Sequence, residues 1–322
     1  MGLLSLLVWA PIFAGLALVA FSGQKYVPVV RWGALLASLA IFALSLQVYA
    51  GFDNAEAGMQ FVEYTQWIPS INSNYHLGID GISLWLVLLN TFITVLVVLA
   101  CWNIEYRLNQ FMGALLALAG LVNGTFLVQD ALLFYVFFEA TLVPMYIIIG
   151  IWGGPRKIYS AFKFFLYTFM GSLFMMVAMA YLYTASGNSF DMQTWHRLPL
   201  SMTEQALILL AFTVAFGVKL PMWPLHTWLP DVHVEAPTGG SAVLASIMLK
   251  LGGYGFLRMA LPIAPDAARE WAWLMIALSL IAVVYIGLVA IVQQDMKKLV
   301  AYSSVAHMGY VTLGMYVFSA EG

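Results

Sequence analysis

Charged side chains are scarce in this sequence of 322 residues. Lys, Arg, Asp and Glu make up 9% of it, whereas they make up about 25% of a typical soluble protein. So few charges could not cover the surface of a soluble protein of this size. Apolar residues, counting Tyr and Cys, reach 63%. The composition therefore indicates a membrane protein.

Cysteine and the common nucleotide-binding motifs are also lacking. The single cysteine, Cys101, excludes a disulfide framework, a CxxC redox pair and an iron–sulfur cluster held by this chain alone. No GxGxxG follows a strand pattern and no GxxxxGK[ST] occurs, so nothing indicates nucleotide binding. A net charge of −2 provides no basic field for nucleic acid. No basic region precedes the apolar run from Gly2, and no cleavage site precedes Lys25, so no cleaved signal peptide is expected.

Long apolar runs are abundant instead. A helix that crosses the membrane needs about 20 mostly apolar residues. These runs do not alternate apolar and polar residues, as strands of a membrane barrel would. The sequence predicts an all-α polytopic membrane protein with ten spans: Gly2–Ser22, Trp32–Phe52, Gly81–Trp102, Phe111–Gln129, Ala131–Trp152, Phe164–Thr184, Ala206–Pro221, Ser241–Ile263, Ala272–Val292 and Leu299–Phe318.

The basic residues predict the orientation, because Lys and Arg concentrate in cytoplasmic loops. Loops are assigned alternately, starting with the N-terminus outside. The inner side then collects eight residues: Lys25, Arg31, Arg107, Arg156, Lys157, Lys163, Lys297 and Lys298. The outer side collects three: Arg197, Arg258 and Arg269. This difference favours an outer N-terminus and, after ten spans, an outer C-terminus.

A proline-rich stretch interrupts the pattern after the short seventh span. KLPMWPLHTWLPDVHVEAPTGG holds four prolines, which remove amide donors and break a helix. One interpretation is a helix broken at membrane depth beside an ion site, as in transporters; the other is an ordinary cytoplasmic loop. His226 and His233 flank Asp231 here. Since no cysteine joins them, a role at the inner proton entrance is favoured over a zinc site.

Four ionisable side chains fall within the predicted spans: Glu139, Lys219, Lys250 and His307. A charge at mid-membrane costs about 2.5–3.5 kcal/mol on insertion scales. Each residue also has a structural interpretation: a protonated, hydrogen-bonded carboxyl for Glu139, static ion pairs for the lysines, and packing for the histidine. Together, without metal-ligand spacing or a nucleophile–base pair, they indicate a proton relay.

The last predicted span is unusually polar along one side. Residues three and four apart share a helix face, so Ser303, His307 and Tyr310 can line one path. Burial favours the neutral form of a lysine or a carboxyl group, and a nearby opposite charge favours the ionised form. Movement of a charge along such a row therefore changes which side chains hold protons. We expect Lys250 to lie on a polar axis between Lys219 and His307.

At these residues the sequence resembles a known family. FFEATLVPMYIIIGIWGGPRKIYSAFKFFLYT around Glu139 and FGVKLPMWPLHTWLPDVHVEAPTGGSAVLASIMLKLGGYG around Lys219 and Lys250 are similar to the antiporter-like subunits of respiratory complex I. SNYHLGIDGISLWLVLLN and QQDMKKLVAYSSVAHMGY follow the same pattern. The FEATLVPM version of the first motif resembles the subunit M, or chain 4, type. The second motif is shared with multi-subunit sodium/proton antiporters and membrane hydrogenases.

The resemblance implies a role for each buried charge. Glu139 matches the essential acidic residue of the fifth helix, and Lys219 the lysine of the broken seventh helix that pairs with it. Lys250 matches the central lysine of the eighth helix, and His307 the connecting histidine of the tenth.

The resemblance also implies a division of the chain. Members carry two inverted five-helix repeats, each with a broken helix. We expect three N-terminal spans with a long outer loop in 1–110, the complete first repeat in 111–263, and the start of the second repeat in 264–322. The second broken helix and its charged exit residue are absent, so the C-terminal part of the family pattern is missing.

The function implied is proton translocation by a membrane subunit of NADH–quinone oxidoreductase, coupled to electron transfer elsewhere in the complex. The alternatives are a subunit of a multi-subunit sodium/proton antiporter or membrane hydrogenase, and a purely structural subunit. The resemblance places no cofactor on this chain: NADH, FMN, iron–sulfur clusters and quinone belong to other subunits. The partners implied are L-type and N-type neighbours and lipid, without nucleic acid, in a bacterial inner membrane.

Overall fold

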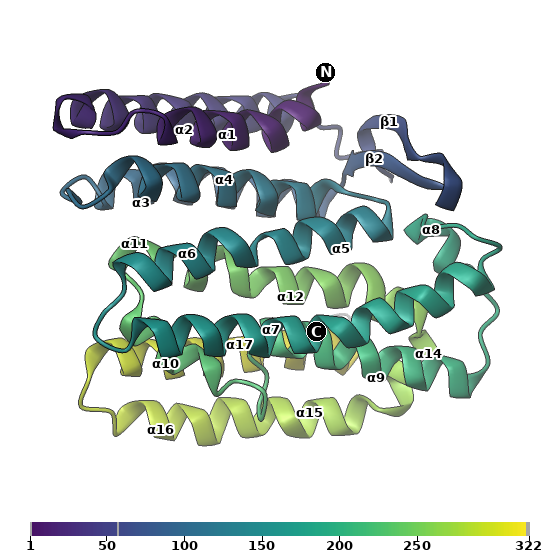
Figure 1. The fold of residues 1–322 in the computed structure, drawn as a ribbon. Helices are drawn as coiled ribbons and strands as arrows, with labels where there is room; N and C mark the ends of the chain where they lie inside the picture. Colours follow the sequence, from purple (N-terminus) through teal and green to yellow (C-terminus); the bar gives the residue numbers. More distant parts are fainter. Residues whose placement is uncertain (1, 57, 320–322) are drawn as a thin grey trace. The chain divides into compact units, whose positions relative to one another are not determined.

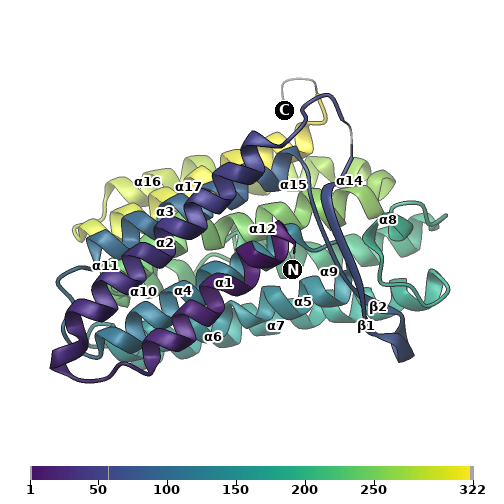
Figure 2. The same ribbon diagram turned by 90° about the horizontal axis from the view of Figure 1, so that it is seen from above.

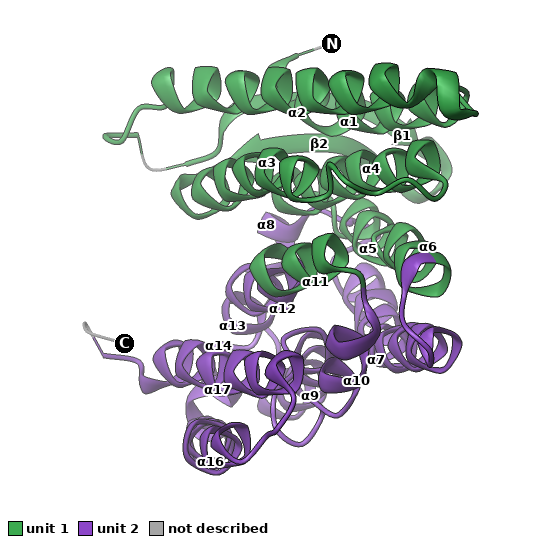
Figure 3. Ribbon diagram, turned by 90° about the vertical axis from the view of Figure 1, so that its left-hand side faces the viewer, with its two compact units in different colours: residues 1–151, 237–247 green, residues 152–236, 248–322 purple. Residues whose placement is uncertain are grey.

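The computed structural model describes residues 2–56 and 58–319, and it divides into two compact units (Figure 3). The first comprises residues 1–151 and 237–247, and the second residues 152–236 and 248–322. These units are defined by contacts within the chain and differ from the predicted repeat boundaries. The division into repeats stays a prediction.

The first unit is built mainly from long helices (Figure 1). Its elements are α1 (Leu3–Val19), η1 (Gln24–Tyr26), α2 (Val27–Ala50), β1 (Gln60–Ile68), η2 (Pro69–Ile71), β2 (Ser73–Ile79), α3 (Gly81–Ala100), α4 (Leu108–Leu127), α5 (Ala131–Ala140), α6 (Leu142–Trp152) and α11 (Thr238–Val243).

Glycines allow α1 and α4 to approach closely: a Cβ on Gly113 would lie 2.8 Å from the carbonyl oxygen of Gly15. Small residues at such crossings are typical of membrane helices.

A β-hairpin lies within the loop predicted between the second and third spans. Strands β1 and β2 pair antiparallel, and Asn72 takes a left-handed conformation before β2 begins. Asp130 ties the hairpin to the helices: its carboxylate accepts hydrogen bonds from Ser73 Oγ at 3.1 Å and from the amide of Asn74 at 2.8 Å. The sequence analysis missed this hairpin.

The second unit contains the remaining helices. They are α7 (Lys157–Ala185), α8 (Met192–Trp195), α9 (Met202–Lys219), α10 (Trp228–Glu235), α12 (Leu249–Gly255), α13 (Leu261–Ile263), α14 (Pro265–Glu270), α15 (Ala272–Ile281), α16 (Gly287–Ile291) and α17 (Met296–Val317). Helix α17 packs along α15 and α16 (Figure 2). Ser279 Oγ and Thr312 Oγ1, 2.7 Å apart, join α15 to α17.

Three π-helical segments interrupt the α-helices between residues 244 and 286: η3 (Leu244–Met248), η4 (Phe256–Ala260) and η5 (Ala282–Ile286). Two of them flank α12 within one continuous helix over Thr238–Ile263. Single π turns inside α-helices occur frequently at functional sites. Lys250 is the second residue of α12 and therefore lies between two such turns.

Within the described residues, eight helices are long and apolar enough to cross a membrane. They are Gln24–Ala50, Gly81–Ala100, Leu108–Leu127, Ala131–Trp152, Lys157–Ala185, Met202–Lys219, Thr238–Ile263 and Ala272–Ile291. Helix α1, with 17 residues, is slightly shorter, and α17, with 22, is more polar. Each of the ten predicted spans corresponds to a helix or a run of helices, which confirms the all-α polytopic class.

Candidate functional site

Lys219 is buried at the point where a helix is interrupted. Helix α9 begins with a capping box between Ser201 and Glu204 and ends at Lys219, two residues before Pro221. The Lys219 side chain is 3% exposed. The C-terminal end of a helix carries a partial negative charge, which favours a cation there. The helix end therefore stabilises the protonated form of Lys219, and burial opposes it.

Trp228 links α10 to the end of α9. Its indole Nε1 donates a hydrogen bond to the carbonyl oxygen of Val218 at 2.9 Å. The ring centroids of Trp228 and Phe164 lie 5.4 Å apart, which anchors the first turn of α10 against α7. Helix α10 begins after residues 220–227, which fits both a broken membrane helix and a loop between two helices, so the broken-helix interpretation stays a prediction.

Glycines bring α12 against the end of α9. A Cβ on Gly252 would lie 2.6 Å from the carbonyl oxygen of Phe216 and 2.8 Å from the amide nitrogen of Leu220. Both are backbone atoms, so only glycine allows this approach. Lys250, which is half-buried, thus lies on a helix that packs against the helix of Lys219.

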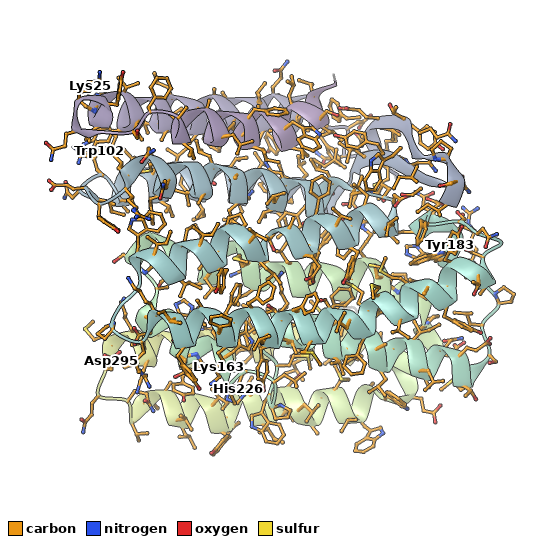
Figure 4. The ribbon with its side chains drawn as sticks, in the orientation of Figure 1. Lys25, Trp102, Lys163, Tyr183, His226 and Asp295 are labelled. Atoms are coloured by element: carbon orange, nitrogen blue, oxygen red, sulfur yellow. The ribbon has the colours of Figure 1, made fainter. Side chains whose placement is uncertain are left out.

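The three residues predicted at the inner entrance lie on or beside α10. Asp231 accepts a hydrogen bond from Lys163 Nζ at 2.6 Å, with the two side chains 26% and 21% exposed. Burial and the positive charge of Lys297 lower the pKa of His233 to about 4, and burial lowers the pKa of His226. Both imidazoles are therefore neutral near pH 7. Lys163 and His226 are labelled in Figure 4.

Three basic residues that the sequence analysis used only for the orientation contact α10 or the residues that follow it. Lys163 contacts Asp231, as described above. Arg156 contacts the buried Glu235: the backbone amide of Arg156 donates a hydrogen bond to the Glu235 carboxylate at 2.9 Å, and the Arg156 Nε lies 3.7 Å from that carboxylate. Lys297 Nζ donates to the carbonyl oxygens of Val234 and Ala236 at 3.2 and 3.0 Å. These residues lie in or next to the loops that connect predicted spans, and their spacing in the sequence does not show which helix they contact.

His307 lies on the last predicted span, in α17, but its side chain is not buried. Its side chain is exposed on α17, and its Nδ1 lies 3.4 Å from Ser303 Oγ. The buried face of α17 carries Val305, Gly309 and Thr312, and it turns His307 and Tyr310 outward. The prediction that His307 is buried is wrong for the part of the chain that the structure describes, although the shared face of Ser303 and His307 is confirmed.

Glu139 lies beside a second helix interruption. Helix α5 ends at Ala140, and α6 begins at Leu142. Pro144 explains the interruption, because it has no amide hydrogen to donate to the carbonyl of Ala140. Glu139 is half-buried and belongs to the first compact unit, whereas Lys219 belongs to the second. Their pairing stays a prediction.

Across residues 2–56 and 58–319, no group of three or more His, Cys, Asp and Glu side chains is arranged to hold a metal ion. What remains is a set of ionisable groups at interrupted or widened helices. Such groups can bind and release protons within the membrane.

Known proteins share this fold and sequence. The family model for the transmembrane part of NADH:quinone oxidoreductases and Mrp antiporters matches residues 128–322. NADH-quinone oxidoreductase subunit M of Rhodobacter capsulatus is 48% identical over 99% of this chain, and NADH-ubiquinone oxidoreductase chain 4 of Arabidopsis thaliana is 43% identical over the same share. The chain spans 65% and 64% of their lengths, respectively.

Solved structures agree in fold. A chain of respiratory complex I from Thermus thermophilus with bound NADH matches 97% of this chain at 30% identity, with a TM-score of 0.87 and 64% of that chain covered. A chain of the Mrp complex from Dietzia matches 98% at 22% identity, with a TM-score of 0.84 and 34% of that chain covered. At that lower identity the second match concerns the fold alone.

Proposed function

This chain belongs to the membrane-subunit family shared by NADH:quinone oxidoreductases and Mrp antiporters, and we propose that it translocates protons as the subunit M of an NADH:quinone oxidoreductase. One observation carries the proposal: Lys219 is buried at the end of an interrupted membrane helix. A buried lysine at such a position is costly for packing alone. It is useful where a proton is bound and released in turn.

The relay uses four residues. Glu139 supplies the negative charge that lets Lys219 hold a proton, and removal of that charge lets burial expel the proton. Lys250 receives it, and His307 passes it on along α17. The exposed position of His307 on α17 supports a role in handing the proton to whatever packs on that face.

Protons enter from the inner side beside α10. His226, Asp231 and His233 form the entrance, and Lys163 forms an ion pair with Asp231 at 2.6 Å. Neutral, buried imidazoles can accept a proton at one ring nitrogen and donate one from the other. The low pKa of His233 means that this imidazole does not retain a proton near pH 7.

The setting follows from the same proposal. The chain lies in a bacterial inner membrane with its N-terminus on the outer side, between L-type and N-type antiporter-like subunits. NADH, FMN, iron–sulfur clusters and quinone bind to other subunits. Residues 111–263 form the first five-helix repeat, residues 264–322 begin the second, and residues 1–110 precede both.

A second candidate function is a subunit of a multi-subunit sodium/proton antiporter or a membrane hydrogenase. The observation that favours it is the likeness in fold to the Mrp complex chain. An ion gradient or hydrogen oxidation would then drive the same relay.

The proposal is tested by Glu139→Gln in the purified complex, reconstituted in liposomes. This substitution preserves size and hydrogen bonding but removes the charge. We expect NADH-driven proton translocation to fall about tenfold or more, since a positioned proton-transfer group contributes about 100-fold or more. Assembly should be unchanged. Glu105→Gln, at an exposed carboxylate between α3 and α4, is the matched control and should translocate normally. Normal translocation by an assembled Glu139→Gln complex would refute the relay.

A further inference from the structure

Three long side chains follow one face of the helix that carries Lys250. Lys250, Tyr254 and Arg258 are spaced four residues apart, which places neighbours together on a helix surface. The contact between the last two is direct: Arg258 Nε donates to Tyr254 Oη at 3.0 Å, and the guanidinium carbon lies 5.3 Å from the ring centroid. The face runs from Lys250 toward the end of the helix that the orientation proposal places outside.

The half-buried side chain of Arg258 lies against a buried ring. Tyr254 lies one turn nearer the inner end of the helix and is 2% exposed. Side chains on an α-helix lean toward its N-terminus, so Arg258 reaches back toward Lys250. An arginine that only snorkelled to the outer interface would extend the opposite way. A half-buried cation is therefore held against Tyr254, on the side of Lys250 that the orientation proposal places outside.

The backbone around Arg258 is fixed from the outer loop. Pro262, four residues on, has no amide hydrogen to donate to the carbonyl of Arg258. His196 occupies that carbonyl instead, with its Nε2 at 2.9 Å. Arg258 also lies in the π-helical segment η4. The hydrogen bond from His196 thus fixes the helical turn that carries Arg258.

We infer that Arg258 is an electrostatic barrier that closes the outer side of the Lys250 site. This inference rests on the proposed function. Arginine stays protonated at all physiological pH values, and fixed arginines exclude protons from membrane pores. A proton that reaches Lys250 therefore meets a permanent positive charge on the outward route and leaves sideways, toward α17.

The charge of Arg258 also affects the pKa of His196 in the outer loop. Burial lowers the pKa of His196, and the positive charge of Arg258 lowers it further, although the hydrogen bond to the Arg258 carbonyl and the charge of Asp191 act in the opposite direction. His196 lies outside the eight span-length helices. His196 and Arg258 are therefore in contact both through a hydrogen bond and through their charges.

The test is the passive proton permeability of liposomes that contain the purified complex and an internal pH dye. A pH gradient is imposed without NADH or quinone, and its decay is followed. We expect Arg258→Gln to accelerate the decay about tenfold, since a unit charge roughly 12 Å away changes proton occupancy by about that factor at an effective dielectric constant of about 20. Arg197→Gln, which removes an exposed outer-side charge, should behave as wild type.

Tyr254→Phe provides a second variant, which keeps the ring and removes the hydroxyl that aims Arg258. It should accelerate the decay less than Arg258→Gln does. If the pH gradient decays at the wild-type rate in both variants, the barrier is refuted. It is also refuted if Arg197→Gln accelerates the decay as much as Arg258→Gln does. If Arg258→Gln does not assemble, Tyr254→Phe decides. NADH added afterwards tests the proposed function separately, because a wild-type complex that fails to translocate protons would refute that proposal without affecting the leak measurement.

Discussion

At the scale of single residues, Lys219 shows how a membrane helix can carry a lysine whose protonation state is able to change. The end of α9 offers the partial negative charge of its last carbonyls, while burial at 3% exposure favours the neutral amine. The two effects oppose each other, so a modest change in the nearby charge can shift the proton. A side chain that could not lose its proton would gain from the first effect and never respond to the change.

Lys219→Arg therefore should be far more harmful than its chemical similarity suggests. The guanidinium stays protonated when buried, whereas an ammonium does not. We expect NADH-driven proton translocation to fall about tenfold or more, measured in liposomes with the assembled complex. Lys25→Arg, at an exposed lysine labelled in Figure 4, is the control and should have no effect. An active Lys219→Arg complex would mean that only a positive charge is needed.

Asp231 and Lys163 form a partly buried pair, so each residue depends on the other. Asp231→Asn leaves the lysine without its carboxylate, and Lys163→Met leaves the aspartate without its cation. Either change should cost about 1–3 kcal/mol, between the values for exposed and fully buried pairs. We expect less assembled complex in membranes for both single variants.

The double variant separates structure from transport. Removing both charges should restore much of the assembly, since no unbalanced charge remains. If Asp231 also serves the proton entrance, translocation per NADH oxidised should stay low in the double variant. If both the amount of assembled complex and the translocation per NADH oxidised recover, the pair only stabilises α10.

At the scale of elements, the sequence predicted each span but not what interrupts it. Apolar length defines a membrane helix, and four prolines marked the break after α9. The π turns around Lys250 and the break after Glu139 depend on packing and on one proline within an apolar run. The β1–β2 hairpin was missed because the low hydropathy of this segment indicated only a loop. The π turns and the hairpin depend on contacts with other parts of the chain, which the local sequence does not reveal.

The packing of α12 on α9 yields a prediction at this scale. Gly252→Ala would place a methyl group 2.6 Å from the Phe216 carbonyl oxygen, so the two helices must separate. The separation changes the distance between the helices that carry Lys219 and Lys250. We expect about 1–3 kcal/mol of destabilisation and slower proton translocation, measured by assembly on native gels and by liposome acidification.

Gly287→Ala is the matched control for this substitution. Gly287 is also helical, but a Cβ there would meet nothing within 4 Å. Helix propensity should even favour the change by about 0.5–1 kcal/mol. If the two substitutions behaved alike, close packing at Gly252 would not be what positions α12.

At the scale of the whole molecule, the candidate site could be predicted as a set of residues but not as an arrangement. Buried charges stand out in an apolar sequence, which is why Glu139, Lys219 and Lys250 were recognised. The exposure of His307 and the contacts of Lys163, Arg156 and Lys297 arise from how α10 and α17 pack. Those contacts join residues more than 60 positions apart, which no spacing rule reveals.

The energy source of the relay is likewise a property of an assembly. With one cysteine, this sequence has no ligand set of its own for an iron–sulfur cluster, and the proposed function assigns electron transfer to other subunits. We expect a tagged chain, purified in mild detergent, to bring with it an NADH-oxidising, quinone-reducing activity. Proton movement in liposomes should then require NADH and quinone and should proceed equally in sodium and potassium media. Sodium-driven proton movement without any co-purified NADH oxidation would instead assign the chain to an antiporter.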